Sequence, residues 1–192
     1  DLEPLDFASA YGLKGPVVLA VGRHVPQKNL DMLIRAMRIL RDQGMEADLV
    51  LVGEGPERPG LEALRDELGL QEHVVLAGFR SDVPAFFKAS QVFAMPSDFE
   101  GLPIAHLEAM YCGLPAVVSE HVPSLEIASE ASLVCQRDPL DIADKIGRIL
   151  RDDDLRARLS ANARRLAEPH TMRNYAGTLH TVYENILAGK AP

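Results

Sequence analysis

Short apolar segments alternate with longer segments of helical periodicity along the chain. The apolar segments are rich in β-branched residues and nearly continuous in apolar character, which indicates strands that are covered on both faces. We predict six strands, at Pro16–Val21, Ala47–Val52, Val74–Ala77, Val92–Met95, Ala116–Ser119 and Ser132–Val134. Because such alternation is typical of parallel strands joined by crossover helices, the pattern predicts an α/β fold with a buried parallel sheet.

The predicted helices occupy the segments between and after those strands. The clearest one has a single apolar stripe at helical spacing, formed by Leu30, Leu33, Ile34, Met37 and Leu40. Gly44 is expected to end it. Further helices are predicted at residues 57–68, 83–89, 103–111, 139–150, 152–166 and 172–187. No internal repeat or low-complexity tract divides the chain.

Composition and charge narrow the class of protein. With 192 residues, 47% of them hydrophobic, the chain suits one large domain, and we treat residues 1–192 as a single globular unit. No segment approaches the roughly eighteen uninterrupted apolar residues of a membrane span. The net charge of -8 and the lack of a Lys/Arg cluster argue against a nucleic-acid partner. Cys112 and Cys135 lie in apolar segments, which is typical of reduced thiols in a cytosolic protein.

We expect binding and catalytic residues in the loops that follow the strands, because open α/β sheets bind ligands at the carboxyl ends of their strands. The loop after the first strand contains Gly22, Arg23 and Lys28 beside a helix start, where free N–H groups and the helix dipole favour an anion. The two cations mark a candidate phosphate site, and the glycine permits a close backbone approach. The alternative is that both cations are solvated loop charges. We interpret His24 as a surface histidine.

Glycines also follow the next two strands. The segment Gly53-Glu54-Gly55 lacks the third glycine of a dinucleotide-binding fingerprint and follows the wrong strand for one, which argues against a dehydrogenase. These glycines either form a simple turn into the next helix or leave room for a ligand. After the third strand, we interpret Phe79 as a core side chain rather than as a stacking platform for a nucleobase.

Two carboxylates frame the helix start after the fourth strand. Glu100 lies in a glycine-containing loop, Pro103 suits the first helical position, and Glu108 lies further along the helix. Because Glu108 has apolar neighbours in the sequence, its burial would cost several kcal/mol unless a partner such as a ligand hydroxyl were present. The alternative is that Glu100 favours the helix dipole and Glu108 faces solvent. We interpret His106, between them, as a surface residue.

Taken in order, these segments resemble a known family. The motifs are Val21-Gly22-Arg23 with Pro26-Gln27-Lys28-Asn29, Leu51-Val52-Gly53-Glu54-Gly55-Pro56, Gly78-Phe79, Glu100 and Glu108 separated by seven residues, Glu108-Ala109-Met110, and Cys112-Gly113-Leu114-Pro115. Each motif is weak alone, but their common order and spacing are specific and cover nearly the whole chain. The chain resembles the C-terminal, donor-binding domain of the group 1 retaining glycosyltransferases with a GT-B fold, which are glycosyltransferase family 4-like.

The resemblance implies a doubly wound, Rossmann-like sheet that binds a nucleotide diphosphate sugar, such as a UDP-sugar or a GDP-sugar. By position in the motifs, Arg23 and Lys28 would hold the diphosphate, and both would act in catalysis together with Glu100, which would contact the donor sugar. Glu108 would bind the ribose. The full expected donor-binding set is Gly22, Arg23, Lys28, Gly53, Phe79, Arg80, Glu100, Gly101, Leu102 and Glu108. No metal or other cofactor is expected.

The same resemblance implies a hexosyltransferase of polysaccharide biosynthesis that acts in the cytoplasm or at the inner face of the membrane. A separate N-terminal domain would bind the saccharide or lipid-linked acceptor. The chain begins at Asp1 without an initiator Met, so we expect a fragment that lacks this domain, is nearly inactive alone, and has a post-linker segment at residues 1–12. The final helix, ending near Leu187, resembles one that packs on the missing domain, so its apolar face is expected to be exposed.

Two departures from the family pattern affect single contacts. Pro103, which has no N–H, stands where many relatives carry a glycine, and His121-Val122-Pro123 stands where relatives often have a glycine pair. Two alternatives remain open for the function, a nucleotide-sugar epimerase half-domain and a non-catalytic nucleotide-binding module. A phosphorylase is disfavoured because the sequence has no candidate motif for a pyridoxal-binding lysine. The base, the sugar, the acceptor and the oligomeric state are not predicted.

Overall fold

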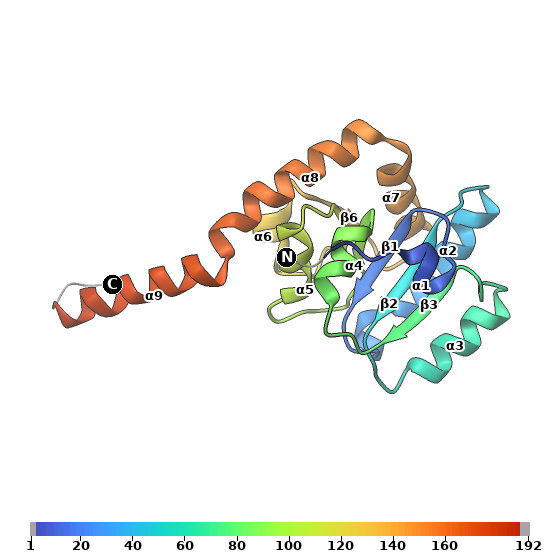
Figure 1. Ribbon diagram of the computed structural model, residues 1–192, viewed down its shortest axis with the longest axis horizontal. Helices are drawn as coiled ribbons and strands as arrows, with labels where there is room; N and C mark the ends of the chain where they lie inside the picture. The colour runs from blue at the N-terminus through green and yellow to red at the C-terminus, as the bar shows by residue number, and fades with distance from the viewer. Residues whose placement is uncertain (1–2, 189–192) are drawn as a thin grey trace.

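A computed structural model describes residues 3–188 of the chain, with a parallel sheet at the centre of the molecule (Figure 1). The strands of this sheet are β1 (Val17–Val21), β2 (Asp48–Val52), β3 (Val74–Gly78), β4 (Val92–Met95), β5 (Ala116–Ser119) and β6 (Ser132–Cys135). Each strand agrees with its predicted bounds to within one residue. The apolar segments therefore identified the sheet correctly.

The order of the strands determines where a ligand can bind. The sheet has the order β3-β2-β1-β4-β5-β6, and every adjacent pair is parallel. The chain winds outward from β1 in one direction and from β4 in the other, which confirms the doubly wound, Rossmann-like fold. Sheets of this kind bind ligands outside the carboxyl ends of the two strands where the winding direction reverses. In this chain that switch point lies between β1 and β4.

Helices cover both faces of the sheet (Figure 1). They are α1 (Phe7–Tyr11), α2 (Leu30–Asp42), α3 (Arg58–Glu67), α4 (Val83–Ala89), α5 (Ile104–Tyr111), α6 (Leu125–Ala128), α7 (Pro139–Arg151), α8 (Asp153–Ala167) and α9 (Met172–Leu187), with short 3₁₀ helices η1 (Pro26–Lys28) and η2 (Glu168–His170). Each predicted helix is present. The sequence missed α1, α6, η1 and η2, because a segment of three to five residues is too short to show a helical period. Pro103 lies just before α5 and not at its first helical position.

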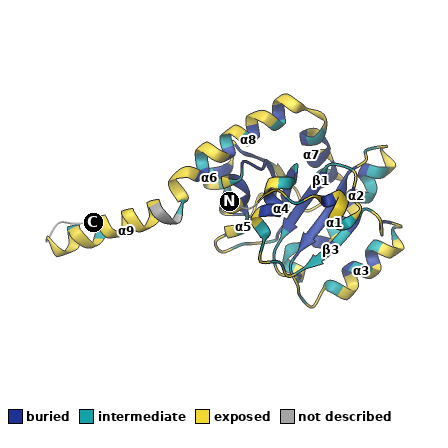
Figure 2. Ribbon diagram, in the orientation of Figure 1, coloured by how far each residue is buried: buried dark blue, intermediate teal, exposed yellow. Residues whose placement is uncertain are grey.

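The two largest hydrophobic clusters of the core lie on opposite faces of the sheet, and a smaller third cluster joins α5, α6 and α8. Along β1, Val18 and Ala20 pack in one cluster with the apolar stripe of α2, while Val17 and Leu19 pack in the other with Phe86 of α4. This alternation follows from the two-residue period of a strand, whose successive side chains point to opposite faces. Figure 2 shows the central strands coloured as buried, so the prediction of a covered sheet is confirmed.

His106 lies on the buried face of α5, so its interpretation as a surface residue is wrong. Its ring stacks on Phe93 at 5.8 Å between centroids, and its Nδ1 and Nε2 lie 2.6 Å from Ser124 Oγ and 3.3 Å from Ser132 Oγ. Burial lowers the pKa of this imidazole to about 4. Sequence analysis could not predict this burial, because the side chains that contact the imidazole come from segments distant along the chain.

Both cysteines have free thiols and pack in the protein. Cys135 is buried, and burial raises the pKa of its thiol to about 12, while Cys112 is half-buried and its thiol pKa is also raised by burial. Because thiolates rather than thiols react, neither residue has the features of a nucleophile. The structure therefore favours the structural role expected for them.

Helix α9 extends away from the body of the molecule (Figure 1), and Figure 2 shows most of its length as exposed. Its exposed apolar side chains include Tyr175, Leu179, Tyr183 and Ile186, which confirms the predicted exposure of this helix. Within residues 3–188, no helix is both long enough and apolar enough to cross a membrane. Of the predicted post-linker segment, residues 3–12 are described and include α1, whereas Asp1 and Leu2 lie outside the described residues.

Candidate functional site

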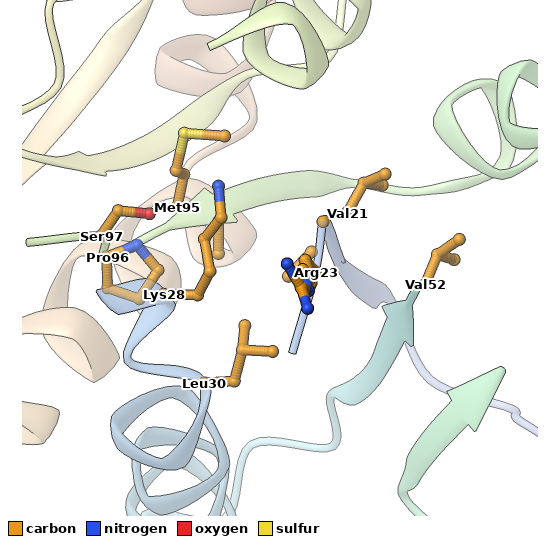
Figure 3. Close-up of a pocket in the computed structure, with 11 residues that line it drawn as sticks. Val21, Arg23, Lys28, Leu30, Val52, Met95, Pro96 and Ser97 are labelled. Atoms are coloured by element: carbon orange, nitrogen blue, oxygen red, sulfur yellow. The ribbon is translucent and has the colours of Figure 1, made fainter. Parts of the chain in front are cut away.

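The loops after β1 and β4 meet at the switch point and line a small pocket (Figure 3). Gly22, Arg23 and Lys28 line it from the β1 side, and the segment from Met95 to Ser97 lines it from the β4 side. In the view of Figure 3, the Lys28 side chain lies between this segment and Arg23. The structure thus brings the predicted phosphate-binding residues together at the place where the topology predicts a ligand.

Lys28 forms an ion pair with Glu100, whose loop follows β4. Lys28 Nζ lies 2.5 Å from Glu100 Oε1, and their side chains are 17% and 9% exposed. Such shielding from solvent strengthens the Coulombic attraction between the two charges relative to that in an exposed salt bridge. The candidate phosphate residue and the candidate sugar residue are therefore in direct contact.

The Ser97 hydroxyl is a polar group of this pocket that sequence analysis did not single out. Its Oγ is buried and has no hydrogen-bond partner among the described residues. Since an unpaired buried hydroxyl is unfavourable, this atom is a candidate partner for an oxygen of a bound molecule. The pocket therefore offers one neutral donor beside its two cations.

Further bonds join the loop after β1 to the loop after β4. Gln27 Nε2 donates to Phe99 O at 3.2 Å, and Asp98 N donates to Gln27 O at 2.8 Å. Asn29 Nδ2 donates to Pro96 O at 2.9 Å and to Asp98 Oδ1 at 2.7 Å. These bonds fix the relative position of the two loops on which Lys28 and Glu100 stand.

Asn29 has a left-handed backbone conformation, with φ of 50°, at the point where η1 gives way to α2. Asparagine tolerates this conformation better than most residues. The sequence signal was an asparagine directly before an apolar helical stripe, but its contacts with the loop after β4 are long-range and cannot be seen in the sequence. Asn29 and Asp98 are thus structural members of the site that the sequence analysis missed.

Gly53 and Gly55 are required by packing between loops. A Cβ at Gly53 would lie 2.0 Å from Gly22 O, and a Cβ at Gly55 would lie 2.2 Å from His24 O. Gly53 N also donates to Gly78 O at 2.9 Å. These glycines therefore let the loop after β2 pack directly against the loop after β1, instead of forming only a turn.

His24 is fully buried, so its interpretation as a surface residue is wrong. Neither ring nitrogen has a hydrogen-bond partner among the described residues, and burial lowers the pKa of the imidazole. His24 N donates to Glu54 O at 2.9 Å, which turns this residue toward the loop after β2. The close packing of the two loops leaves the ring no path to solvent.

Phe79 is 80% exposed, so its interpretation as a core side chain is wrong. Phe79 directly follows β3. The preceding residue, Gly78, accepts a hydrogen bond from Gly53 N, and Gly53 packs against Gly22 of the loop after β1. Arg80 forms a two-point ion pair with Asp82, at 2.9 and 2.8 Å, and lies over the Phe86 ring. Arg80 is therefore occupied in holding the start of α4, whereas the Phe79 ring is available to a ligand.

The remaining predicted residues lie in the loop before α5 and on α5 itself. Gly101 and Leu102 are exposed in the loop that carries Glu100, and Glu108 is exposed on α5. The argument that Glu108 needs a partner because of burial is therefore wrong. Partial burial nevertheless raises the pKa of its carboxyl. Within the described part of the chain, no three acidic, histidine or cysteine side chains are grouped so that they could hold a metal ion.

Comparison with known proteins identifies the family. The sequence profile of the family described as "Glycosyl transferases group 1" matches residues 3–166. Among curated proteins, the GDP-mannose-dependent alpha-(1-6)-phosphatidylinositol monomannoside mannosyltransferase of Mycolicibacterium smegmatis is 37% identical over 155 residues, which are 74% of this chain and 41% of that protein. The chain thus spans less than half of the length of this relative.

Solved structures share the fold. Sucrose-phosphate synthase from Thermosynechococcus elongatus matches with a TM-score of 0.81 and 27% identity, over 98% of this chain and 50% of that one. Anabaena HepE, solved with UDP and glucose, matches with a TM-score of 0.80 and 24% identity, over 91% of this chain and 50% of that one, and shows the fold alone. The fold is thus the C-terminal half of a GT-B fold, and the chain belongs to the group 1 family of glycosyltransferases.

Proposed function

We propose that this chain is the donor-binding domain of a retaining glycosyltransferase, which transfers a hexose from a nucleotide diphosphate sugar to a saccharide or lipid-linked acceptor. The observation that carries the proposal is the contact between Lys28 and Glu100 at the switch point, with Arg23 lining the same pocket. A diphosphate bound there meets two cations, and the sugar attached to it meets a carboxylate. The unpaired Ser97 hydroxyl supports the same binding mode.

The proposed chemistry needs these charges in these places. When the bond between the sugar and the diphosphate breaks, negative charge grows on the diphosphate and the sugar becomes oxocarbenium-like. Arg23 and Lys28 would stabilise the leaving diphosphate, while Glu100, which holds Lys28 through their ion pair, would stabilise and orient the sugar. No metal is required in this scheme. In the full-length enzyme, replacing either cation by alanine is expected to lower turnover about a hundredfold, as for other preorganised charge donors.

The nucleoside is proposed to lie across the adjacent loops. GDP-mannose is named for a curated relative and UDP for a solved structure, and these compounds share a ribose and a diphosphate but differ in the base. We assign the shared diphosphate to Arg23 and Lys28 and the ribose to Glu108. The base is assigned to the exposed Phe79 after β3. Transfer to an acceptor requires a second domain, and we place the reaction in the cytoplasm.

A thermal-shift panel of UDP, GDP, ADP and their sugars tests the proposal on the chain itself. A ligand at a hundred times its dissociation constant adds about 2.7 kcal/mol, which is roughly 5 to 10 °C in Tm for a chain of this size. We expect one diphosphate and its sugar conjugate to stabilise the chain, and the corresponding nucleoside, which lacks the diphosphate, to have a much smaller effect. A chain that responds to none of them at millimolar concentration would contradict a donor-binding role.

A further inference from the structure

The loop after β4 is attached to two other loops of the same sheet edge through one carboxylate. Asp98 Oδ1 accepts hydrogen bonds from Asn29 Nδ2 at 2.7 Å and from Arg137 Nη1 at 2.6 Å. Asn29 precedes α2 on the β1 side, whereas Arg137 lies between β6 and α7. Asp98 therefore connects the centre of the carboxyl edge with the strand at its far end.

The backbone of the same residue is also held, since Asp98 N donates to Gln27 O at 2.8 Å. Glu100 follows only two residues later, in a loop that has no regular secondary structure until α5 begins at Ile104. Gly101 comes next and adds backbone freedom. The position of the Glu100 carboxylate thus depends on how firmly residue 98 is held.

We propose that Asp98 and Arg137 are positioning residues for the donor sugar, which hold the loop after β4 so that Glu100 stays against Lys28 in the sugar subsite. This inference rests on the proposed function, because it takes Glu100 as the sugar-binding carboxylate. Arg137 does not touch the sugar in this scheme. It acts through Asp98, and so it determines how strongly the sugar part of the donor is recognised.

The solvent exposure of the Arg137–Asp98 ion pair distinguishes a positioning role from a purely structural role. The side chains of Arg137 and Asp98 are 47% and 35% exposed, and ion pairs at such exposure contribute little to the stability of a fold. Removing the guanidinium should therefore leave the fold intact while it loosens one loop. An effect on recognition without an effect on stability is the expected signature.

The test compares a nucleoside diphosphate with its sugar conjugate by titration calorimetry of this chain. The probe pairs are UDP with UDP-glucose, GDP with GDP-mannose, and ADP with ADP-glucose, and the pair that binds wild type best is used. We expect Arg137→Ala to weaken binding of the sugar conjugate about twofold to fivefold, the range that an exposed ion pair can supply, and binding of the diphosphate much less. Arg137→Lys, which keeps the charge, should recover part of the loss. Arg158→Ala, on the exposed face of α8, is the matched control.

Hydrogen exchange of the loop supplies a readout that needs no ligand. Faster exchange of the backbone amides at residues 97–102 is expected in Arg137→Ala and not in Arg158→Ala, with unchanged thermal unfolding in both variants. The inference is overturned if Arg137→Ala leaves both the exchange and the sugar preference unchanged, or if it weakens both ligands equally. A wild-type chain that binds none of the three pairs would instead contradict the proposed function, and the exchange measurement would still test how residue 98 is held.

Discussion

Lys28 Nζ lies 2.5 Å from Glu100 Oε1, so the phosphate-binding cation and the sugar-binding carboxylate of the proposed site are paired with each other. A bound donor would offer both residues other partners, because its diphosphate attracts the ammonium and its sugar hydroxyls can donate to the carboxylate. The pair therefore keeps two shielded charges neutralised and in position before the donor arrives.

Glu100→Gln is expected to have opposite effects on the two parts of the donor. The variant removes a negative charge beside the phosphate site. A nucleoside diphosphate should therefore bind about threefold or more tightly to the variant than to wild type. The additional affinity that the attached sugar gives should be lost. Titration calorimetry with both ligands checks this, with Glu67→Gln on the exposed side of α3 as the control. Weaker binding of the bare diphosphate in Glu100→Gln would show that Glu100 does not compete with the phosphate for Lys28.

Phe79→Ala tests whether the exposed ring binds the base. Stacking of a base on an aromatic ring contributes about 1 to 3 kcal/mol, so the variant should bind the preferred nucleoside diphosphate about tenfold more weakly. Because the side chain is 80% exposed, thermal unfolding should not change. Leu140→Ala, which truncates another exposed apolar side chain, should leave the affinity unchanged. Equal affinities of wild type and Phe79→Ala would remove the ring from the nucleoside site.

Gly53→Ala is expected to destabilise the chain, because the new Cβ would lie 2.0 Å from Gly22 O on a backbone with φ of +135°. We expect a loss of about 3 kcal/mol or more in the free energy of unfolding. Gly60→Ala in α3 is the matched change, since its Cβ meets nothing within 4 Å and alanine favours a helix by roughly 0.5 to 1 kcal/mol. Urea denaturation measures both. Similar stabilities of the two variants would mean that the loops after β1 and β2 do not pack as described.

The buried His106 predicts a stability that falls in mild acid. Its pKa is lowered from 6.5 to about 4 by burial, so between these values the unfolded chain binds a proton that the folded chain does not. The free energy of unfolding therefore decreases as the pH falls below 6.5 and levels off, for this group, near 4, with a total change of order 3 kcal/mol. His24, whose pKa burial also lowers, acts in the same direction.

Urea denaturation of wild type and His106→Asn across this pH range measures the effect. The variant should be less stable at neutral pH, because its contacts with Ser124 and Ser132 change, but its stability should depend less on pH. His180→Asn, on the exposed surface of α9, should retain the wild-type dependence. A parallel pH profile in His106→Asn would contradict the assignment of the acid sensitivity to this imidazole.

The fold was predictable because each strand and helix is indicated by a pattern within its own short segment of the sequence. Each strand is a short apolar segment bounded by turns, and the stripe from Leu30 to Leu40 specifies one helix face without reference to the rest of the chain. The position of Arg23 and Lys28 at the switch point was predictable for a related reason, since a cation beside a helix start is visible in one segment. The motifs of the family then placed Glu100 in the same site, and the ion pair with Lys28 agrees with that placement.

The errors concern side chains whose surroundings come from distant segments. His106 is satisfied by serines that lie 18 and 26 residues further along, and His24 is covered by the loop after β2. Phe79 was assigned to the core because aromatic residues are usually buried, but the chain turns outward at the end of β3 and exposes the ring. The role of Asp98 as a link between loops depends on Asn29 and Arg137, and no local pattern could reveal it.

The central claim is that Arg23 and Lys28 bind the diphosphate of the donor. Titration calorimetry of UDP, GDP and ADP with wild type, Arg23→Ala, Lys28→Ala and the exposed control Arg35→Ala tests it most directly. We predict that one diphosphate binds to wild type and to Arg35→Ala alike, and about tenfold to a hundredfold more weakly to each of the other variants, because each loses a charged hydrogen bond. Unchanged affinity in both Arg23→Ala and Lys28→Ala would contradict the account.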